Sequence, residues 1–170
     1  VLGNHDKPRI ASRVGAQDAR LAAMLLLTLR GTPTIYYGDE LGMTDVAVPL
    51  HKVQDPAELR EPGKGQGRDP ERSPMQWDSS QHAGFSTVEP WLPVSDDFQT
   101  TNVVHERALP SSMFTFYKSL LHLRKENQAL SRGDYQSVKV SDSHFAYLRS
   151  YKNSVFLIAL NFAAEGKCTI

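Results

Sequence analysis

The sequence has only one cysteine, Cys168, so it cannot form an internal disulfide bond or a metal site built on paired cysteines. It also lacks an excess of charge, because 19 Lys and Arg residues balance 19 Asp and Glu residues. Surfaces that bind nucleic acid or anionic membranes need such an excess, and we expect neither partner. The lone cysteine and the absence of an N-glycosylation acceptor favour a cytoplasmic location.

Long apolar runs are also missing. The longest mainly apolar run, Leu21–Leu29, is much shorter than the roughly 20 residues that a membrane-spanning helix needs. The first residues contain neither a Met nor the charged and apolar regions of a signal peptide. We therefore expect no membrane contact in this segment, and we expect the chain to be a fragment of a longer protein.

The first 40 residues follow the order strand, helix, strand. Residues 1–3 are mostly apolar, residues 16–29 are apolar on almost every side, and residues 34–37 are β-branched and aromatic. Gly31 and Pro33 indicate where the helix ends. Such a βαβ unit has parallel strands and a right-handed crossover. The polar residues after both strands then lie at the edge where α/β proteins carry their sites; they are Asn4, His5, Asp6, Asp39 and Glu40.

Residues 44–110 show no helical or strand periodicity and are rich in Pro, Gly and charge. A connection of this length is uncommon unless it is functional or disordered. The segment contains aromatic residues that disordered tracts seldom have, among them Trp77, Phe85 and Trp91. We therefore expect a long ordered loop.

A second helix is expected at residues 113–127, where Ser111 and Ser112 are N-cap candidates. Its apolar stripe comprises Phe116, Leu120 and Leu123, with Tyr117 and Leu121 on a flank. After Gly133 the periodicity changes to two, which predicts a small antiparallel β domain. Its strands are expected at residues 135–140, 145–151 and 155–162, with a hairpin turn at residues 152–154.

The triplet Asn4-His5-Asp6 places an imidazole and a carboxylate side by side, which suits a metal site, an acid/base pair or hydrogen bonding to a polyol. Gly3-Asn4-His5-Asp6 also resembles one motif of the metallophosphoesterases, whose metal centre needs further His and Asp ligands. The other histidines are isolated, and none stands in a Gly-His-x-His pair. The metallophosphoesterase hypothesis is therefore weak.

Four blocks taken together resemble the α-amylase superfamily of glycoside hydrolases, glycoside hydrolase family 13, and most closely its α-glucosidase and oligo-1,6-glucosidase members. Their cores read Val-Leu-Gly-Asn-His-Asp, Gly-Asp-Glu-Leu-Gly-Met, Gly-Arg-Asp-Pro-Glu-Arg-Ser-Pro-Met-Gln-Trp-Asp and Ala-Gly-Phe-Ser. The blocks lie in residues 1–9, 30–43, 67–78 and 83–86. Their order and separations make the resemblance more specific than any single block does.

The resemblance implies an α/β fold: the C-terminal portion of a (β/α)8 TIM barrel, from the end of strand 7 to helix 8, followed by the start of an antiparallel β domain. Residues 1–132 would then be the C-terminal part of the catalytic barrel, including a long loop after strand 8. Residues 133–170 would begin a C-terminal β-sandwich domain. The long loop would build part of the pocket at the C-terminal face of the barrel.

By the same resemblance, Asp6 is the third carboxylate of the family's active site, which binds hydroxyls of the glucose at the cleavage subsite. His5 would hydrogen-bond the same sugar. Arg68 would close the pocket behind the terminal glucose by pairing with an Asp from early in the barrel, unless Arg72 has that role.

Other polar and aromatic residues receive structural roles. Asp39 and Glu40 are expected to stabilise a loop, and Arg9 to hold the turn after Asp6 through the backbone or a carboxylate. Trp77 and Phe85 are expected to be buried loop anchors in preference to sugar-stacking platforms.

The implied activity is that of a retaining, exo-acting α-glucosidase that acts on maltose, isomaltose or short oligosaccharides. The nucleophile and the acid/base belong to strands 4 and 5 of the family's barrel, which would precede Val1, so we expect the fragment alone to be inactive. No cofactor or metal ligand is predicted here, and calcium in the parent protein stays open.

Two alternatives remain open within this resemblance. One is a glucosyl-transferring or isomerising relative, such as a trehalose synthase or a sucrose isomerase. The other is the glycosidase-like heavy chain of an amino-acid transporter, which has no catalytic role.

Overall fold

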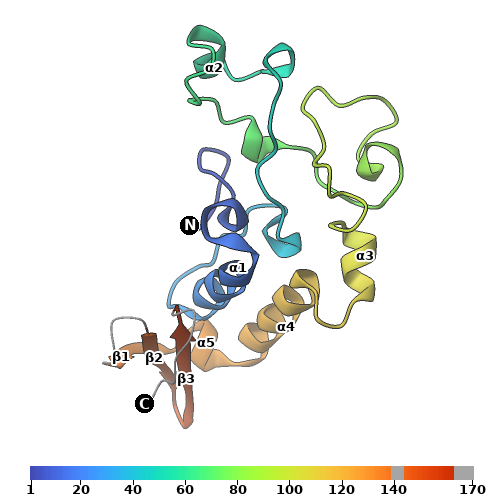
Figure 1. The fold of residues 1–170 in the computed structure, drawn as a ribbon. Coiled ribbons are helices and arrows are strands. Elements are labelled where there is room, and N and C mark those ends of the chain that lie inside the picture. The colour runs from blue at the N-terminus through green and yellow to red at the C-terminus, as the bar shows by residue number, and fades with distance from the viewer. Residues whose placement is uncertain (139–143, 163–170) are drawn as a thin grey trace.

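The computed structural model describes residues 1–138 and 144–162. Figure 1 shows two long helices, a small sheet packed at one end of them, and at the other end the long loop of residues 44–110, which we call the excursion. The helices are α1 (Ile10–Thr28), α2 (Pro56–Arg60), α3 (Val103–Ala108), α4 (Met113–Glu126) and α5 (Gln128–Ser131). The strands are β1 (Asp134–Val138), β2 (His144–Tyr151) and β3 (Ser154–Asn161), and short 3₁₀ turns cover Asp39–Leu41, Leu50–Lys52, Pro70–Arg72 and Gln81–Gly84. Residues 139–140 of the predicted first strand and Cys168 lie outside the described residues.

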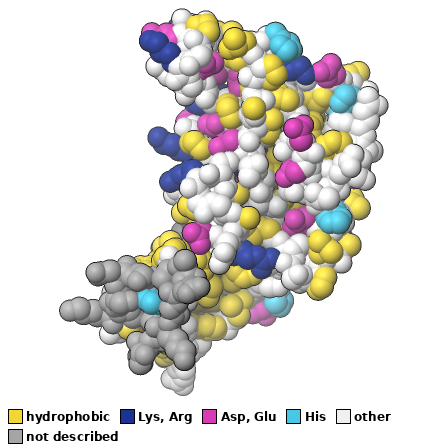
Figure 2. All heavy atoms as spheres, in the orientation of Figure 1, with side chains coloured by type: hydrophobic (Ala, Val, Ile, Leu, Met, Phe, Trp, Pro, Cys, Tyr) yellow, Lys and Arg dark blue, Asp and Glu magenta, His cyan; other side chains and the backbone are white. Residues whose placement is uncertain are grey.

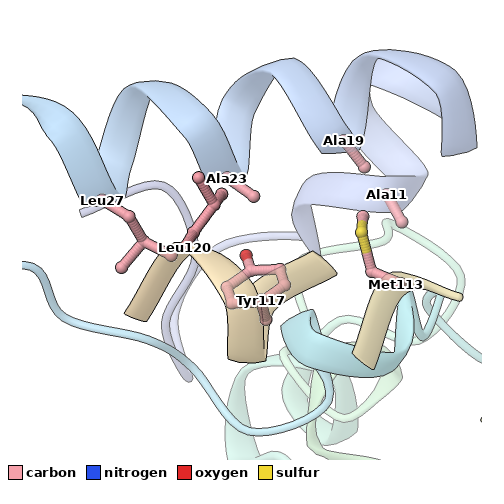
Figure 3. Packing of buried hydrophobic residues seen from close by; sticks show 7 residues of the cluster. All are labelled: Ala11, Ala19, Ala23, Leu27, Met113, Tyr117 and Leu120. Atoms are coloured by element: carbon pink, nitrogen blue, oxygen red, sulfur yellow. The ribbon is translucent and has the colours of Figure 1, made fainter. Parts of the chain in front are cut away.

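Helix α1 packs against α4 through small residues. Its alanines allow the two helices to approach closely, and Leu27 fills the far end of the contact (Figure 3). The buried residues of this contact are Ala11, Ala19, Ala23, Leu27, Met113, Tyr117 and Leu120.

Helix α1 differs from its prediction at both ends. It begins at Ile10 and is interrupted at Gly15, whose φ of 82° is not helical. It ends at Thr28 with an extended Leu29, before the Gly31 that was expected to cap it. The helix can end here because Arg124 satisfies carbonyl groups at its C-terminus. The Arg124 guanidinium donates to the carbonyls of Leu27, Leu29 and Gly31.

Helix α4 confirms its predicted start, since the Ser112 side chain accepts a hydrogen bond from the backbone N–H of Thr115. The predicted buried stripe was partly wrong. Leu120 and Tyr117 are buried, but Leu121 and Leu123 are 41% and 38% exposed. Arg124 lies on the buried face instead, where it bonds to the end of α1.

The two predicted parallel strands, residues 1–3 and 34–37, do not form a strand ladder in the described part of the chain. The segments still lie side by side, because a Cβ added to Gly3 would be 3.8 Å from Cβ of Tyr36. Their side chains and backbone are therefore adjacent without the hydrogen bonds that define a sheet. The prediction of a βαβ unit is thus wrong, because residues 1–3 and 34–37 do not pair as β-strands.

The predicted antiparallel sheet is confirmed, with strand order β1-β2-β3. A two-residue turn joins β2 to β3, and Lys152 in it has a φ of 52°. One face of the sheet packs on α1 and α5 through Leu130, Tyr147, Ile158 and Leu160. This contact attaches the sheet to the helical part of the chain.

The excursion is ordered, as expected, and consists of short helices and turns. Leu41, Met43 and Met75 form a small core beneath it. The buried side chain of Gln76 donates to the carbonyl of Thr101 and so ties two distant turns together. Among residues 1–138 and 144–162, no helix has the length and apolar character that crossing a membrane requires.

Candidate active site

A tight turn presents Asp6 at the surface. Asn4 and Lys7 form an isolated bridge, and the side chain of Asn4 accepts from the backbone N–H of Asp6 at 2.9 Å. The turn brings His5 Nε2 to 3.2 Å from Asp6 Oδ2, and both side chains are accessible to solvent. The sequence neighbours His5 and Asp6 therefore form one polar pair.

Two arginines from the excursion meet this pair. Arg68 Nη1 donates to Asp6 Oδ1 at 2.8 Å, and Arg72 Nη2 donates to the same oxygen at 3.3 Å. Arg72 also donates through Nε to the carbonyl of His5 at 2.8 Å. The structure thus brings together all three predicted site residues. It also places both Arg68 and Arg72 on Asp6, although only one of the two was predicted to close the pocket.

A second carboxylate, that of Asp55, contacts the same two arginines. Asp55 Oδ2 accepts from Arg68 Nε at 2.7 Å and lies 4.0 Å from Arg72 Nη1. Its side chain is fully buried, and its other oxygen caps α2 by accepting from the N–H of Ala57. Sequence reasoning missed Asp55. The dipeptide Asp55-Pro56 was the available signal, since Asp followed by Pro is typical of a helix N-cap and its first residue.

Arginine contacts hold both carboxylates in their ionised form. The hydrogen bond from Arg68 lowers the pKa of Asp6, and the charges of His5, Arg68 and Arg72 add to this effect. The pKa of Asp55 is also well below its ordinary value, first because of Arg68 and then because of the Ala57 N–H. Figure 2 shows basic and acidic side chains next to one another at the upper left of the molecule, where Figure 1 places α2.

Asp39 and Glu40 accept hydrogen bonds from the backbone of the turn at residues 36–39. Asp39 Oδ2 accepts from the N–H of Tyr36 at 3.2 Å, and Glu40 Oε2 accepts from the N–H of Gly38 at 2.8 Å. Burial raises the pKa of Asp39 to about 6. Both carboxylates therefore stabilise this turn, as expected.

Arg9 is fully buried, but its guanidinium does not hold the turn after Asp6. Its Nη1 donates to the carbonyl of Tyr37 at 2.6 Å, and the guanidinium lies 4.7 Å from the centre of the Tyr37 ring. The predicted backbone contact exists, but it supports the turn at Tyr37.

Trp77 and Phe85 are not the buried anchors that were expected. They are 49% and 50% exposed, and they line an open cavity of about 390 Å³ together with Trp91 and Arg72. The turn between Trp77 and Phe85 is left-handed, with φ near 56° at His82 and Ala83. The Ala83 carbonyl accepts from the N–H of Trp77, so this turn fixes the backbone of Trp77 close to the residue two positions before Phe85.

The described residues, 1–138 and 144–162, contain no group of three or more His, Cys, Asp or Glu side chains placed to hold a metal ion. Arg68 and Arg72 both pair with Asp6, so guanidinium groups already compensate the charge of this carboxylate. The polar cluster suits a neutral ligand rich in hydroxyl groups.

Comparison with known proteins agrees with this description. The family model for the α-amylase catalytic domain matches residues 1–133. The glucan 1,6-α-glucosidase of Streptococcus pneumoniae is 39% identical over 95% of this chain, which covers 35% of that protein. The oligo-1,6-glucosidase of Parageobacillus thermoglucosidasius is 35% identical over 96% of the chain, which covers 34% of it. The chain therefore spans about one third of the length of these relatives.

Solved structures give the same result for the fold. The trehalulose synthase of Pseudomonas mesoacidophila aligns with a TM-score of 0.85 and 35% identity, over 96% of this chain and 34% of that one. A trehalose-6-phosphate hydrolase of Bacillus licheniformis aligns with a TM-score of 0.81 and 34% identity, over 94% and 33%. These matches overturn the metallophosphoesterase hypothesis and support the α-amylase type of fold with its antiparallel sheet. The chain belongs to the α-amylase family of glycoside hydrolases and is similar to its α-glucosidases.

Proposed function

We propose that the protein that contains this chain is a retaining, exo-acting α-glucosidase that releases glucose from maltose, isomaltose or short oligosaccharides. The observation that carries the proposal is the position of Asp6, an accessible carboxylate that Arg68, Arg72 and His5 contact at once. The relatives named as glucosidases support this substrate class.

In this proposal, Asp6 binds the terminal glucose and does not form a covalent bond to it. Its two oxygens accept hydrogen bonds from neighbouring ring hydroxyls, which strengthen as the sugar distorts towards the oxocarbenium-like transition state. His5 donates to or accepts from the same ring. The guanidinium groups of Arg68 and Arg72 keep Asp6 ionised and close one side of the sugar site.

The covalent steps need two further carboxylates, a nucleophile and an acid/base about 5 to 5.5 Å apart. We propose that these groups belong to a part of the protein that precedes Val1. We further propose that residues 1–132 form the C-terminal part of the catalytic barrel and residues 133–170 the beginning of a β-sandwich domain. The match of the family model to residues 1–133 and the start of β1 at Asp134 support this division.

A second candidate is an isomerising or glucosyl-transferring enzyme. The similarity to trehalulose synthase supports it, because the two proteins are 35% identical over 96% of this chain. In that case the same Asp6 would bind the glucosyl unit while another sugar, instead of water, accepts it. The non-catalytic transporter heavy chain and the cytoplasmic location stay predictions from the sequence.

The test uses the full-length protein with maltose, isomaltose and sucrose, and it identifies the products by chromatography. Release of glucose in the α-configuration, followed by NMR, is expected for a retaining glucosidase, whereas a rearranged disaccharide from sucrose would support the second candidate. Asp6→Asn should lower kcat/KM by about 100-fold or more, because a group that stabilises the transition state is weakened. Full activity of Asp6→Asn would exclude the proposed role.

A further inference from the structure

Arg68 follows a turn that offers it little support of its own. Residues 61–67 contain three glycines, and Gly63 and Gly65 have left-handed φ values of 82° and 66°. A Cβ added to either glycine would meet nothing within 4 Å, so no side chain packs over this part of the turn. The direction of the Arg68 guanidinium must therefore come from contacts outside the turn.

Glu58 of α2 supplies the first of these contacts. Its Oε1 accepts from the N–H of Gly63 at 2.7 Å, and its Oε2 accepts from Gln66 at 2.8 Å and Gly67 at 3.0 Å. One side chain thus binds both ends of the turn, up to the residue before Arg68. Only glycine fits at residue 67, because the Cβ of any other residue would lie 2.8 Å from Cβ of Glu58 and would clash with it.

Asp55, one turn earlier in the chain, supplies the second contact. Its Oδ2 accepts from both the backbone N–H of Arg68 at 3.0 Å and the side-chain Nε at 2.7 Å. Because Nε is engaged by Asp55, Nη1 on the other side of the planar guanidinium points to Asp6. Asp69 holds Asp55 in turn, since its Oδ2 accepts from the N–H of Asp55 at 2.8 Å.

We propose that Asp55 and Glu58 are positioning residues that hold the Arg68 guanidinium at Asp6, Asp55 through the side chain and Glu58 through the backbone of the turn. This proposal rests on the proposed function. When hydroxyl groups of the substrate replace Arg68 as hydrogen-bond partners of Asp6, Arg68 keeps its bonds to Asp55. It therefore stays at the edge of the site. The α2 segment therefore sets the shape of the sugar site without contacting the sugar.

The test compares Glu58→Gln, Asp55→Asn, Arg68→Ala and their double variants in the full-length protein, with isomaltose as substrate. Glu58→Gln should lower kcat/KM by about 10- to 100-fold, mainly through KM, because a misplaced binding group weakens substrate binding. The acid limb of the kcat/KM profile should move to higher pH, since Asp6, faced by His5, Arg68 and Arg72, loses part of its contact with Arg68. Glu61→Gln is the matched control, because the Glu61 carboxylate bonds to the side chains of Lys64 and Gln66, whereas the Glu58 carboxylate bonds to the backbone of the turn.

The double variants separate positioning from general stability. If Glu58 and Asp55 act through Arg68, then Glu58→Gln and Asp55→Asn add no further loss of kcat/KM in the Arg68→Ala background. Additive losses, or a Glu58→Gln enzyme with unchanged KM and pH profile, would overturn the proposal. Thermal unfolding identifies a variant that fails to fold, and Glu58→Gln is then the informative one, because Glu58 is only partly buried whereas Asp55 is buried.

A crystal structure of Glu58→Gln keeps this proposal distinct from the proposed function. If the wild-type protein hydrolyses no α-glucoside, the proposed function is wrong, but the distance between Arg68 Nη1 and Asp6 Oδ1 still reports on positioning. We expect this distance to lengthen in Glu58→Gln and to stay near 2.8 Å in Glu61→Gln. An unchanged distance in both variants would contradict the proposal.

Discussion

The hydroxyl groups of Thr28 and Tyr147 lie 2.6 Å apart, and this hydrogen bond joins the last residue of α1 to the central strand of the sheet. Both side chains are buried. The two residues are 119 positions apart in the chain, so their contact is one of the links that attach the sheet to the helices.

Tyr147→Phe removes this link and little else. We expect the free energy of unfolding to fall by about 1 kcal/mol, because one buried hydrogen bond is lost while Thr28 keeps its bond to the carbonyl of Met24. Denaturant unfolding measures the change. Tyr135→Phe is the control, since Tyr135 is 37% exposed and stacks on Tyr147 with its ring. Equal effects of the two variants would show that the Thr28 contact contributes nothing.

Arg149 is a fully buried cation whose contacts are backbone carbonyls. It donates to Thr28, to Gly133 at 2.9 Å and to Asp134 at 3.2 Å. Arg149→Met should lower the free energy of unfolding by about 2 to 4 kcal/mol, because these buried carbonyls lose their donor. Arg149→Lys should not restore it, since an ammonium group lacks the planar fork. Thermal unfolding measures the loss of stability, and Arg132→Met is the control because Arg132 is exposed. Full stability of Arg149→Lys would contradict the prediction.

The raised pKa of Asp39 predicts that the free energy of unfolding depends on pH. Its pKa in the folded protein is raised to about 6 by burial, above the ordinary 3.8, so the folded state binds the proton more tightly. The stabilising effect of this proton is complete below about pH 4 and is lost as the pH rises through 6, by about 1 to 3 kcal/mol. Asp39→Asn should remove this fall. Unfolding curves of both proteins between pH 4 and 7 test the sign, and parallel curves would refute the prediction.

Gly84 and Gly65 offer a matched pair of substitutions. Their φ values are 64° and 66°, so Ala is strained to the same degree at both, by about 1 to 2 kcal/mol. A Cβ at Gly84 would also lie 2.6 Å from Asp78 Oδ2, whereas nothing lies within 4 Å of one at Gly65. Gly84→Ala should therefore destabilise the protein more than Gly65→Ala in thermal unfolding. An equal loss would mean that Asp78 moves away without cost.

The chain of residues 1–170 contains Asp6, but we expect it to be inactive alone. The proposed reaction needs a nucleophile and an acid/base in addition to Asp6, and the chain spans about one third of the length of its relatives. Incubation of the purified chain with maltose and isomaltose should release no glucose, while the full-length protein should. Glucose release by the chain itself, absent in Asp6→Asn, would place the whole mechanism within these residues.

The features that sequence alone predicted are local or follow from the four blocks. The serine cap of α4 and the alternation of β2 and β3 depend on residues a few positions apart, so they are readable before folding. The blocks also predicted the family and led to His5, Asp6 and Arg68 as site candidates.

The tertiary structure decided how these pieces meet. Asp6 is 62 positions from Arg68 and 66 from Arg72, and no local pattern says that both guanidiniums reach one carboxylate oxygen. The cap signal of Asp55 is local, but its contact with Arg68 joins residues 13 positions apart and could not be predicted from it. Trp77 and Phe85 are exposed although they are apolar, because hydropathy does not encode which distant segments cover a side chain. Periodicity and capping depend on chain neighbours, whereas charge pairing, burial and helix ends depend on which distant segments the packing brings into contact.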